Sequence, residues 1–522
     1  MCRTNCSSLL QSCKTLQELK QIHAQTIAQG LQHIQPLSCK ILNSYARFKQ
    51  ATDAQIVFRR IRDPDIVSWT SLASLYLQID RPHDAFSIFS SIISRGLIPD
   101  PFAIVLGLSA CGRTEDLLHG KLVHGMIYRH ELGSDTVVGN ALIDMYCRNG
   151  QIQTAQLVFT MIEARDVVSW TSMLHGHIKR KDIQSACRVF EEMPVRNAIS
   201  WTALITGFIQ GGHPIRALQI FHEMKSVGEE PSAVTIVAVL SACADIGALD
   251  LGRSIHGHIS KSDMSFNTAV SNALIDTYSK SGSLKAAEKI FKMMWEKDAY
   301  SWTTMISGFA AHGHGVQAIQ AFLEMLHLGL SPNEVTFLAV LSGCSHAGLI
   351  DEGRRWFEQM QQSYGLKPNV QHYSCMVNLL GRSGLLEEAK KLIASMEIEP
   401  DVIVWRSLLG ACLLHGNMDL AQMAGKKILE LEPDDDGVYI LLWNLYASAG
   451  WWKEALEMRK LMKDRQVGKR PGSSWIEVNG VVHEFFVEDK THKHRQEIFL
   501  VLEGLTDLLK LDDSPLCLEQ AS

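Results

Sequence analysis

The chain has 522 residues, of which 46% are hydrophobic, 20% charged and 7% aromatic, and this apolar share supports a large buried core and excludes a mostly disordered chain. Lys and Arg number 50 against 56 Asp and Glu, a formal charge of −6, so any nucleic-acid binding must depend on local groups of cations. The sequence has no run of 18 apolar residues, and we therefore expect no membrane contact.

The twelve cysteines do not suggest a disulfide framework. None belongs to a C-x-x-C pair, and Cys111, Cys243 and Cys344 each close a Leu-Ser-Ala/Gly-Cys pattern inside an apolar run. We expect reduced, buried thiols in an intracellular, reducing compartment.

Internal repeats dominate the chain. The tripeptide Ser-Trp-Thr occurs at 68–70, 169–171, 200–202 and 301–303, so a short spacing lies between two equal long ones. Asn-Ala-Leu-Ile-Asp begins at 140 and 272, and Leu-Ser-Ala-Cys at 108 and 240, so both recur after one long spacing plus one short spacing. These spacings predict an array of repeats whose length alternates between about 35 and about 31 residues.

A single repeat, 198–232, is typical of a helical hairpin. Ile199 to Gln210 has apolar residues at helical spacing before Gly211 and Gly212, and a second helical segment runs from Ile215 to Lys225. Glycine recurs at the same turn in seven repeats, where we expect a positive φ: Gly150, Gly212, Gly247, Gly282, Gly313, Gly348 and Gly384. Such hairpins bury their apolar faces only by stacking, so we expect an all-α chain, a right-handed α-solenoid superhelix of stacked helical hairpins with a short irregular C-terminal extension.

The repeats resemble those of plant pentatricopeptide repeat proteins, in the subclass that alternates ordinary (P), long (L) and short (S) repeats. The matching features are the Val-Ser-Trp-Thr openings, the helix ends at 191–193 and 222–224, and Gly-x-x-Pro-Asp at 96–100; the constant 34-residue period and W-x2-L-G-x2-Y pattern of tetratricopeptide repeats are missing. The segment 1–34 holds a degenerate repeat from about residue 8. Eleven repeats then fill 35–401: 35–65, 66–100, 101–135, 136–166, 167–197, 198–232, 233–267, 268–298, 299–333, 334–369 and 370–401.

After residue 401 the pattern changes. Residues 402–412 and 439–450 resemble the two E-type motifs of this subclass, which we place at 402–469. Residues 471–478 resemble its PG box, and His483, Asp489 and His492 continue an extended E segment, 470–510, before a tail at 511–522. In the family a zinc deaminase domain can follow, and its chemistry needs H-x-E and P-C-x-x-C.

Neither H-x-E nor C-x-x-C occurs in this sequence. We therefore expect no enzymatic activity, no catalytic residue, no cofactor and no metal. Four H-x-H pairs, at 175/177, 256/258, 312/314 and 492/494, are interpreted as incidental because residues two apart point to different faces of a helix.

The thirteenth residue of every short repeat is basic: Arg47, Arg148, Lys179, Lys280 and Arg382. Evenly spaced cations on a solenoid suit the phosphates of an extended single strand. The alternative is a solvated helix end, where Lys and Arg complement the C-terminal dipole. We favour the phosphate role.

Base choice in the family depends on the fifth and last residues of each repeat. The pairs here are Thr70/Asp100, Asn140/Asp166, Thr171/Asn197, Thr202/Ser232, Asn272/Asp298, Thr303/Asn333 and Ser374/Asp401. Asp only accepts hydrogen bonds and suits the ring N–H of G or U, whereas Asn suits A or C. By resemblance the pairs read G, U, A, a weak A, U, A and G from 5′ to 3′; the L repeats, with Val105, Val237 and Leu338 at the fifth place, leave loosely read gaps, and Cys39/Asp65 is irregular.

The second residue of most repeats is apolar: Val67, Val137, Val168, Ile199, Val234 and Val335. In the family this residue wedges between adjacent bases; the alternative for any one of them is ordinary packing at a helix start.

The resemblance implies a sequence-specific single-stranded RNA-binding protein that selects sites for organellar C-to-U RNA editing and recruits a deaminase-bearing protein in trans through its E region. Two alternatives stay open: an organellar splicing or RNA-stabilising factor, and a protein-binding helical scaffold. We expect a monomer in the mitochondrion, with the chloroplast as the alternative. The segment before Glu18, which includes Arg3 and Lys14 and no acid, suits a transit peptide, although repeat-like sequence already begins near Ser8.

Overall fold

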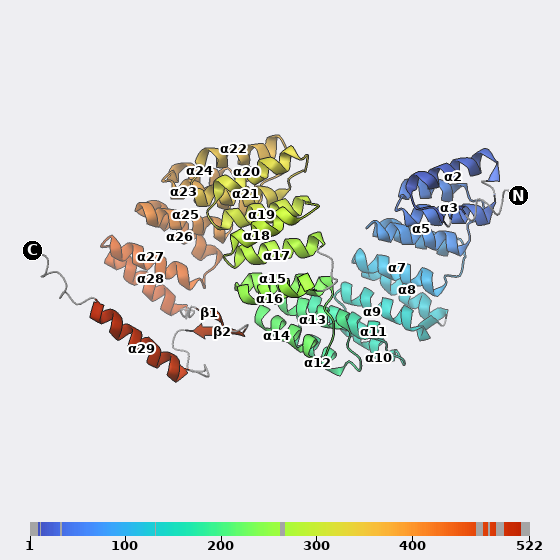
Figure 1. Ribbon diagram of the computed structural model, residues 1–522, viewed down its shortest axis with the longest axis horizontal. Helices are drawn as coiled ribbons and strands as arrows, with labels where there is room; N and C mark the ends of the chain where they lie inside the picture. The colour runs from blue at the N-terminus through green and yellow to red at the C-terminus, as the bar shows by residue number, and fades with distance from the viewer. Residues whose placement is uncertain are drawn as a thin grey trace, which may run out of the picture. The chain divides into compact units, whose positions relative to one another are not determined.

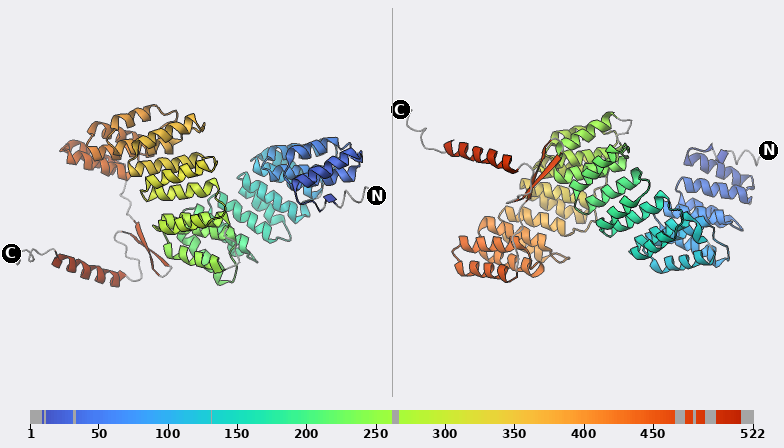
Figure 2. Two further views of the ribbon diagram at one scale, coloured as in Figure 1. Left: turned by 45° about the horizontal axis from the view of Figure 1, so that its top comes forward. Right: turned by 90° about the horizontal axis from the view of Figure 1, so that it is seen from below.

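The computed structural model describes residues 9–10, 12–31, 34–130, 132–261, 267–465, 473–478, 481–486 and 495–512. The chain divides into two compact bodies, Met1–Val239 and Leu240–Ser522, called here the N-terminal and C-terminal bodies. Helices in each body pair into antiparallel hairpins, and successive hairpins stack side by side (Figures 1 and 2). This stacking is the arrangement of an α-solenoid and confirms the predicted fold class.

The helices of the N-terminal body are α2 (Leu16–Ala28), α3 (Gln35–Arg47), α4 (Ala51–Arg60), α5 (Ile66–Gln78), α6 (Pro82–Ser94), α7 (Pro101–Arg113), α8 (Leu117–Arg129), the 3-10 turn η2 (Leu132–Ser134), α9 (Thr136–Arg148), α10 (Ile152–Met161), α11 (Val167–Lys179), α12 (Ile183–Glu192), α13 (Ala198–Gln210) and α14 (Pro214–Ser226). Helix α15 (Ala233–Ile246) contains the boundary between the bodies.

The C-terminal body continues with α16 (Leu249–Lys261), α17 (Thr268–Lys280), α18 (Leu284–Met293), α19 (Ala299–Ala311), α20 (Gly315–His327), α21 (Glu334–Ala347), α22 (Ile350–Gln362), α23 (Val370–Arg382), α24 (Leu386–Ala394), α25 (Val402–His415), α26 (Met418–Leu431), α27 (Asp436–Ser448), α28 (Trp452–Asp464), the strands β1 (Ser473–Val478) and β2 (Val481–Phe486), and α29 (Arg495–Asp512).

The difference in length between the short repeats and the others falls mainly in the second helix of the hairpin. The second helices α4, α10, α12 and α18 of short repeats have 10 residues, whereas α6, α8, α14 and α20 have 13. The turn itself is constant: all seven predicted glycines have a positive φ, between 66° and 82°. Lys49, Asp80, Glu115 and Lys181 adopt the same left-handed conformation in other repeats.

The Ser-Trp-Thr motif joins neighbouring repeats. Its tryptophan packs edge-on against a phenylalanine at the end of the preceding second helix, with centroid distances of 4.6 Å for Phe58–Trp69 and 4.7 Å for Phe190–Trp201. The pairs Phe159–Trp170 and Phe291–Trp302 repeat this contact. Aromatic burial at each junction therefore stabilises the stack one neighbour at a time.

The three patterned cysteines lie inside this core. Cys111, Cys243 and Cys344 are buried, as predicted, and none of the three is in a disulfide. Burial raises the pKa of the Cys111 and Cys344 thiols to about 12, so they are protonated at neutral pH and behave as small apolar side chains.

The C-terminal extension is more regular than expected. Strand β1 pairs antiparallel with β2, with Ser473 opposite Phe486 and Val478 opposite Val481. Both strands are rich in β-branched and aromatic residues, and the sequence between them is Asn-Gly, the dipeptide most typical of two-residue hairpins. His483 is half-buried on β2; Asp489, His492 and the start of the predicted PG box, 471–472, lie outside the described residues.

First helices of neighbouring hairpins approach closely at glycines, and one of them gives a test of the packing. A Cβ added to Gly381 of α23 would lie 2.5 Å from the Cβ of Ala411 on α25, and neither atom can rotate away. We expect Gly381→Ala to lower the free energy of unfolding by roughly 1–3 kcal/mol, because the two helices must separate. Gly410→Ala, with nothing within 4 Å of the new Cβ, should instead stabilise by roughly 0.5–1 kcal/mol. Denaturant unfolding measures both, and equal effects would contradict this view of the packing.

Candidate nucleic-acid interface

The last residue of each repeat is the N-cap of the next first helix. Asp166 shows the geometry: its Oδ1 accepts hydrogen bonds from the Ser169 backbone N–H at 2.8 Å and from the Ser169 hydroxyl at 2.9 Å. The same kind of cap is made by Asp100, Asn197, Ser232, Asp298, Asn333 and Asp401. All seven predicted last-position residues are therefore held in one local geometry.

This cap decides what each side chain still offers. A capping aspartate uses one carboxylate oxygen and keeps a second one, which is an acceptor. A capping asparagine uses its only oxygen, as Asn197 and Asn333 do toward the backbone N–H groups of Ser200 and Thr336 at 3.0 Å, and keeps its NH2 group, which is a donor. The two residue types thus present opposite hydrogen-bonding groups from the same place.

Two of the capping aspartates, Asp166 and Asp298, are ionised at neutral pH. Burial by itself would raise the pKa of Asp166, but hydrogen bonds from the Ser169 backbone, the Asn140 amide and the Ser169 hydroxyl together lower it below its usual range. The pKa of Asp298 is lowered in the same way, by Ser301 and Asn272 against the effect of burial. Both side chains therefore act as acceptors only.

Most of the fifth residues, which were predicted to select bases, are buried. Thr70, Asn140, Thr171, Asn272 and Thr303 are only 3–8% exposed; Thr202 and Ser374 are half-buried.

The fifth residues form hydrogen bonds within the protein. Asn140 donates from Nδ2 to Asp166 Oδ1 at 3.0 Å and accepts from the Ser169 hydroxyl at 2.6 Å. The Thr303 hydroxyl donates to the Ala299 carbonyl at 2.7 Å. The structure thus brings Asn140 and Asp166 together as a pair, with the last residue as the more exposed member.

The second residues are exposed, although they are apolar. Val67, Val137, Val168, Ile199, Val234 and Val335 have exposed fractions between 53% and 67%. Ordinary packing, the alternative considered for these positions, would bury them instead. Phe102, Tyr300 and Ile403 stand at the same register with 55–67% exposure; the sequence analysis missed them, although counting two residues into each segment would have found them.

The five predicted phosphate contacts are each the last residue of a first helix, on α3, α9, α11, α17 and α23. Arg148 pairs with Asp144 at 2.8 Å and Lys280 with Asp276 at 3.0 Å. Lys179 pairs with Glu115 at 3.1 Å and donates to the Arg148 carbonyl at 2.9 Å. These contacts support the helix-end alternative, but exposed pairs are worth only about 0–1 kcal/mol and leave the cations able to exchange partners.

The other two cations differ from these. Arg47 donates to the Cys13 carbonyl at 2.7 Å, so it satisfies an open backbone acceptor. Arg382 forms no ion pair with the described part of the chain. Arg382 is thus the cation most available to a phosphate.

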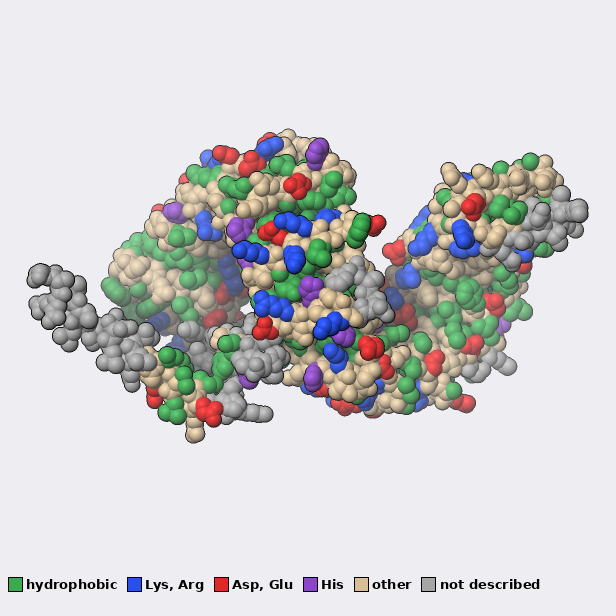
Figure 3. Space-filling model, viewed as in Figure 1, with side chains coloured by type: hydrophobic (Ala, Val, Ile, Leu, Met, Phe, Trp, Pro, Cys, Tyr) green, Lys and Arg blue, Asp and Glu red, His purple; other side chains and the backbone are tan. Residues whose placement is uncertain are grey.

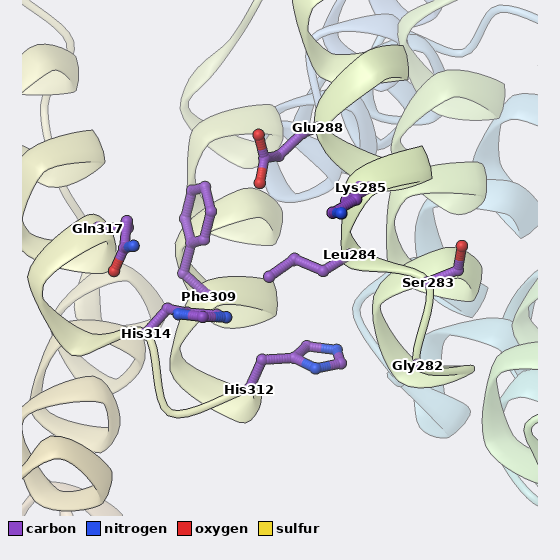
Figure 4. Close-up of a pocket in the computed structure, with 9 residues that line it drawn as sticks. All are labelled: Gly282, Ser283, Leu284, Lys285, Glu288, Phe309, His312, His314 and Gln317. Atoms are coloured by element: carbon purple, nitrogen blue, oxygen red, sulfur yellow. The ribbon is translucent and has the colours of Figure 1, made fainter.

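Open carbonyls at the ends of first helices are satisfied from the next repeat. The His312 ring lies 2.7 Å from the Ser279 carbonyl, and the His346 ring 2.8 Å from the Ala310 carbonyl. Beside His312 a cavity of about 510 Å³ opens between the turns of two hairpins, lined by Lys285, Glu288 and His314 among others (Figure 4). Its opposite charges do not converge on one kind of ligand, so we interpret it as part of the turn edge.

Within the described ranges, no group of three or more His, Cys, Asp or Glu side chains could hold a metal ion. No described helix is long and apolar enough to cross a membrane.

Beyond the repeats, two further hairpins follow. They are α25 with α26 and α27 with α28. On the last of them Trp451, Trp452 and Leu456 are exposed. A cluster of large apolar side chains at the surface is typical of a protein-docking face.

Comparison with known proteins identifies the repeats. Models described as PPR repeat match residues 67–97, 140–167, 168–197, 270–298, 335–364 and 364–397, a PPR repeat family model matches 196–245 and 297–346, and an E motif model matches 415–477.

Relatives from Arabidopsis thaliana align over most of the chain. A putative chloroplastic pentatricopeptide repeat-containing protein is 42% identical over 507 residues, which cover 97% of this chain and 92% of that protein. A mitochondrial one is 42% identical and covers 88% of this chain and 67% of its own length. Another chloroplastic one is 35% identical over 97% of this chain, which spans only 56% of that relative. Among solved structures, PPR10 in complex with an 18-nt psaJ RNA element is similar at 18% identity and a TM-score of 0.45, covering 90% of this chain and 75% of that one.

Proposed function

We propose that this chain, which belongs to the pentatricopeptide repeat family and to its E subgroup, binds single-stranded RNA by sequence and selects sites for C-to-U editing in a plant organelle. The observation that carries the proposal is the row of capping residues. The Asp caps each present a free acceptor and the Asn caps a free donor, spaced by one repeat along the chain, and the single Ser cap, Ser232, is the weakly read position.

The base edges complement these groups. The free carboxylate oxygen of Asp166 accepts from the N3–H of uracil, and that of Asp100 from the N1–H of guanine. The free NH2 groups of Asn197 and Asn333 donate to the N1 of adenine or the N3 of cytosine. The buried fifth residue sets which of the two bases fits, and Asn140 holds the Asp166 carboxylate in place through Oδ1.

The exposed second residues complete the reading surface. An apolar side chain between successive bases replaces base–base stacking with base–side-chain contact and fixes the spacing of the strand. With the L repeats as gaps, the pairs read 5′-GNUAANUANG-3′. The E-type hairpins, with their exposed tryptophans, would dock a deaminase-bearing partner in trans.

The compartment is proposed as an organelle, because relatives are named as chloroplastic and as mitochondrial proteins; of the two we keep the mitochondrion. Fluorescence anisotropy of the purified chain with the decoded RNA and with a scrambled RNA of equal composition tests the RNA-binding step. We expect at least tenfold tighter binding of the decoded RNA, and equal affinities would overturn the proposal.

The editing step needs a separate measurement. In a loss-of-function line, sequencing of organelle transcripts should show lost conversion at one or a few cytidines preceded by the decoded pattern. Intact editing together with a retained intron or a depleted transcript would replace editing with splicing or stabilisation.

A further inference from the structure

A cavity of about 810 Å³ lies within the C-terminal body, at the junction of an L and an S repeat. Helices α16, α17 and α18 line it, with the loop that follows α18. Its floor includes Tyr278 of α17, whose hydroxyl lies 2.9 Å from His256 Nδ1 on α16. A cavity of this size holds a nucleotide-sized molecule, and its hydrogen-bonding floor and apolar wall are typical of ligand sites.

One wall is an exposed aromatic platform. Trp295, just after α18, is fully exposed at 101%, and its neighbour Met293 is 71% exposed. Both line the cavity, together with the buried Met294. A tryptophan left entirely in water at the mouth of a cavity offers a whole ring face for stacking.

Both signs of charge line the cavity, Lys289 from α18 and Glu296 from the loop after it, and two more lysines stand on the helices nearby. Lys289 lines it and is exposed, and Lys261 and Lys285 stand on α16 and α18; none of these three forms an ion pair with the described residues. Burial lowers the pKa of His256, and the charge of Lys289 lowers it further. Basic side chains gather over α16 and α18 in Figure 3. An aromatic ligand whose phosphate reaches Lys289, which stands on α18 whereas Glu296 follows that helix, suits this combination better than an uncharged apolar peptide.

Asn267 belongs both to the lining of the cavity and to the row of capping residues. It is the last residue of the L repeat 233–267 and caps α17 through Oδ1, which accepts from the Val270 N–H at 2.8 Å. Its free group is therefore an NH2 donor, as in Asn197 and Asn333, and the same residue lines the cavity. An RNA strand read in chain order would thus pass the rim of this cavity at one nucleotide.

We propose that the nucleotide opposite repeat 233–267 enters this cavity, with its base stacked on Trp295, a base-edge acceptor on Asn267 Nδ2 and its phosphate near Lys289. This inference rests on the proposed RNA-binding function. It changes the expectation for this L repeat from a gap to a stacked position with little base preference, because every base has a π face.

The long period of the sequence, which relates position 140 to position 272, provides an internal comparison. The residues equivalent to Trp295 and Lys289 at the L–S junction of the N-terminal body are Glu163 and Leu157, whereas Met161, 77% exposed, is equivalent to Met293. The platform and its cation are thus specific to the junction around residue 267. The nucleotide opposite repeat 101–135 and the variant Met161→Ala serve as matched controls.

The test is a double-mutant cycle between protein and RNA, measured by fluorescence anisotropy with 5′-GNUAANUANG-3′. An abasic nucleotide replaces the sixth position, opposite repeat 233–267, or the second, opposite repeat 101–135. We expect the sixth abasic position and Trp295→Ala each to weaken binding by about 5- to 100-fold. When both changes are combined, the loss of affinity should be no larger than the loss from either one alone. Trp295→Phe should recover most of the affinity, and the second abasic position should weaken wild type and Trp295→Ala alike.

The outcomes separate the two levels of the proposal. In one outcome, the wild type binds the decoded RNA more tightly than the scrambled RNA while the losses of affinity from Trp295→Ala and from the sixth abasic position are additive or absent. That result overturns this inference alone and leaves the surface to a protein partner. Loss of discrimination between the two RNAs in the wild type overturns the proposed function as well. Met161→Ala should bind as wild type, and an equal loss from it would overturn a specific role for Trp295.

Discussion

Asp166→Asn is expected to change the base preferred opposite repeat 136–166 from U to C. Asparagine is as good an N-cap as aspartate, and the Ser169 N–H and the Asn140 amide both bond Oδ1, so the new side chain should keep its oxygen there. Its NH2 group then replaces the free carboxylate oxygen and donates to the N3 of cytosine. The preference between the two RNAs should shift by roughly tenfold to a hundredfold in total, with helix content and stability unchanged.

The measurement is the affinity for two decoded RNAs that differ only by U or C at the third position. Asp116→Asn is the matched control, because Asp116 also caps a helix, α8, by accepting from the His119 N–H at 3.1 Å, but it begins a second helix and is no selector. It should leave the U preference intact. An Asp166→Asn protein that still prefers U would mean that the capping residue does not read the base.

The repeat architecture could be predicted from the sequence because it depends on local and periodic signals. The spacing of the Ser-Trp-Thr motif, the helical apolar patterns and the turn glycines all reflect a single hairpin copied along the chain, and the seven glycines have the positive φ that was expected. The burial of the thiols at Cys111, Cys243 and Cys344 followed from the same apolar periodicity.

Contacts between repeats could not be read in the same way. Lys179 and Glu115 lie in different repeats, 64 residues apart in sequence, yet they form an ion pair at 3.1 Å. Counting the basic residues along the sequence does not reveal that this cation has an acidic partner. The burial of Asn140 depends on Ser169 of the next repeat. The N-cap role of the last residue was a local signal, Asp or Asn three residues before Ser or Thr, that the sequence analysis did not use.

The strands β1 and β2 were missed for a different reason. A two-stranded hairpin after a long run of helices has a short signal, here the Asn-Gly dipeptide between two runs rich in β-branched and aromatic residues, and the extension was expected to be irregular. The cap gives a physical reason for the difference between Asp and Asn at the last position. Because one oxygen is committed to the helix, the two side chains differ in a single free group, and in the proposed reading that group accepts or donates while the fifth residue selects between the two bases that fit it.

We expect Tyr300→Ala to lower the affinity for RNA without changing the base preference, whereas Asp166→Asn should change the base preference. Tyr300 is the second residue of repeat 299–333 and is 67% exposed at the start of α19, so its removal deletes a stacking surface without leaving a cavity. Affinity for the decoded RNA should fall by about 5- to 100-fold, while the ratio between RNAs that differ at one decoded base stays constant. Anisotropy titrations of both RNAs measure the two quantities together.

Tyr128→Ala is the matched control for this variant. Tyr128 is 85% exposed, but it stands near the end of a second helix, α8, away from the second-residue register. Its removal should leave RNA affinity unchanged if only the second residues contact bases. Equal losses from Tyr300→Ala and Tyr128→Ala would mean that RNA contacts aromatic side chains without regard to register, and the reading surface would then have to be sought elsewhere. A loss confined to Tyr300, with base preference preserved, would separate the residues that hold the strand from those that read it.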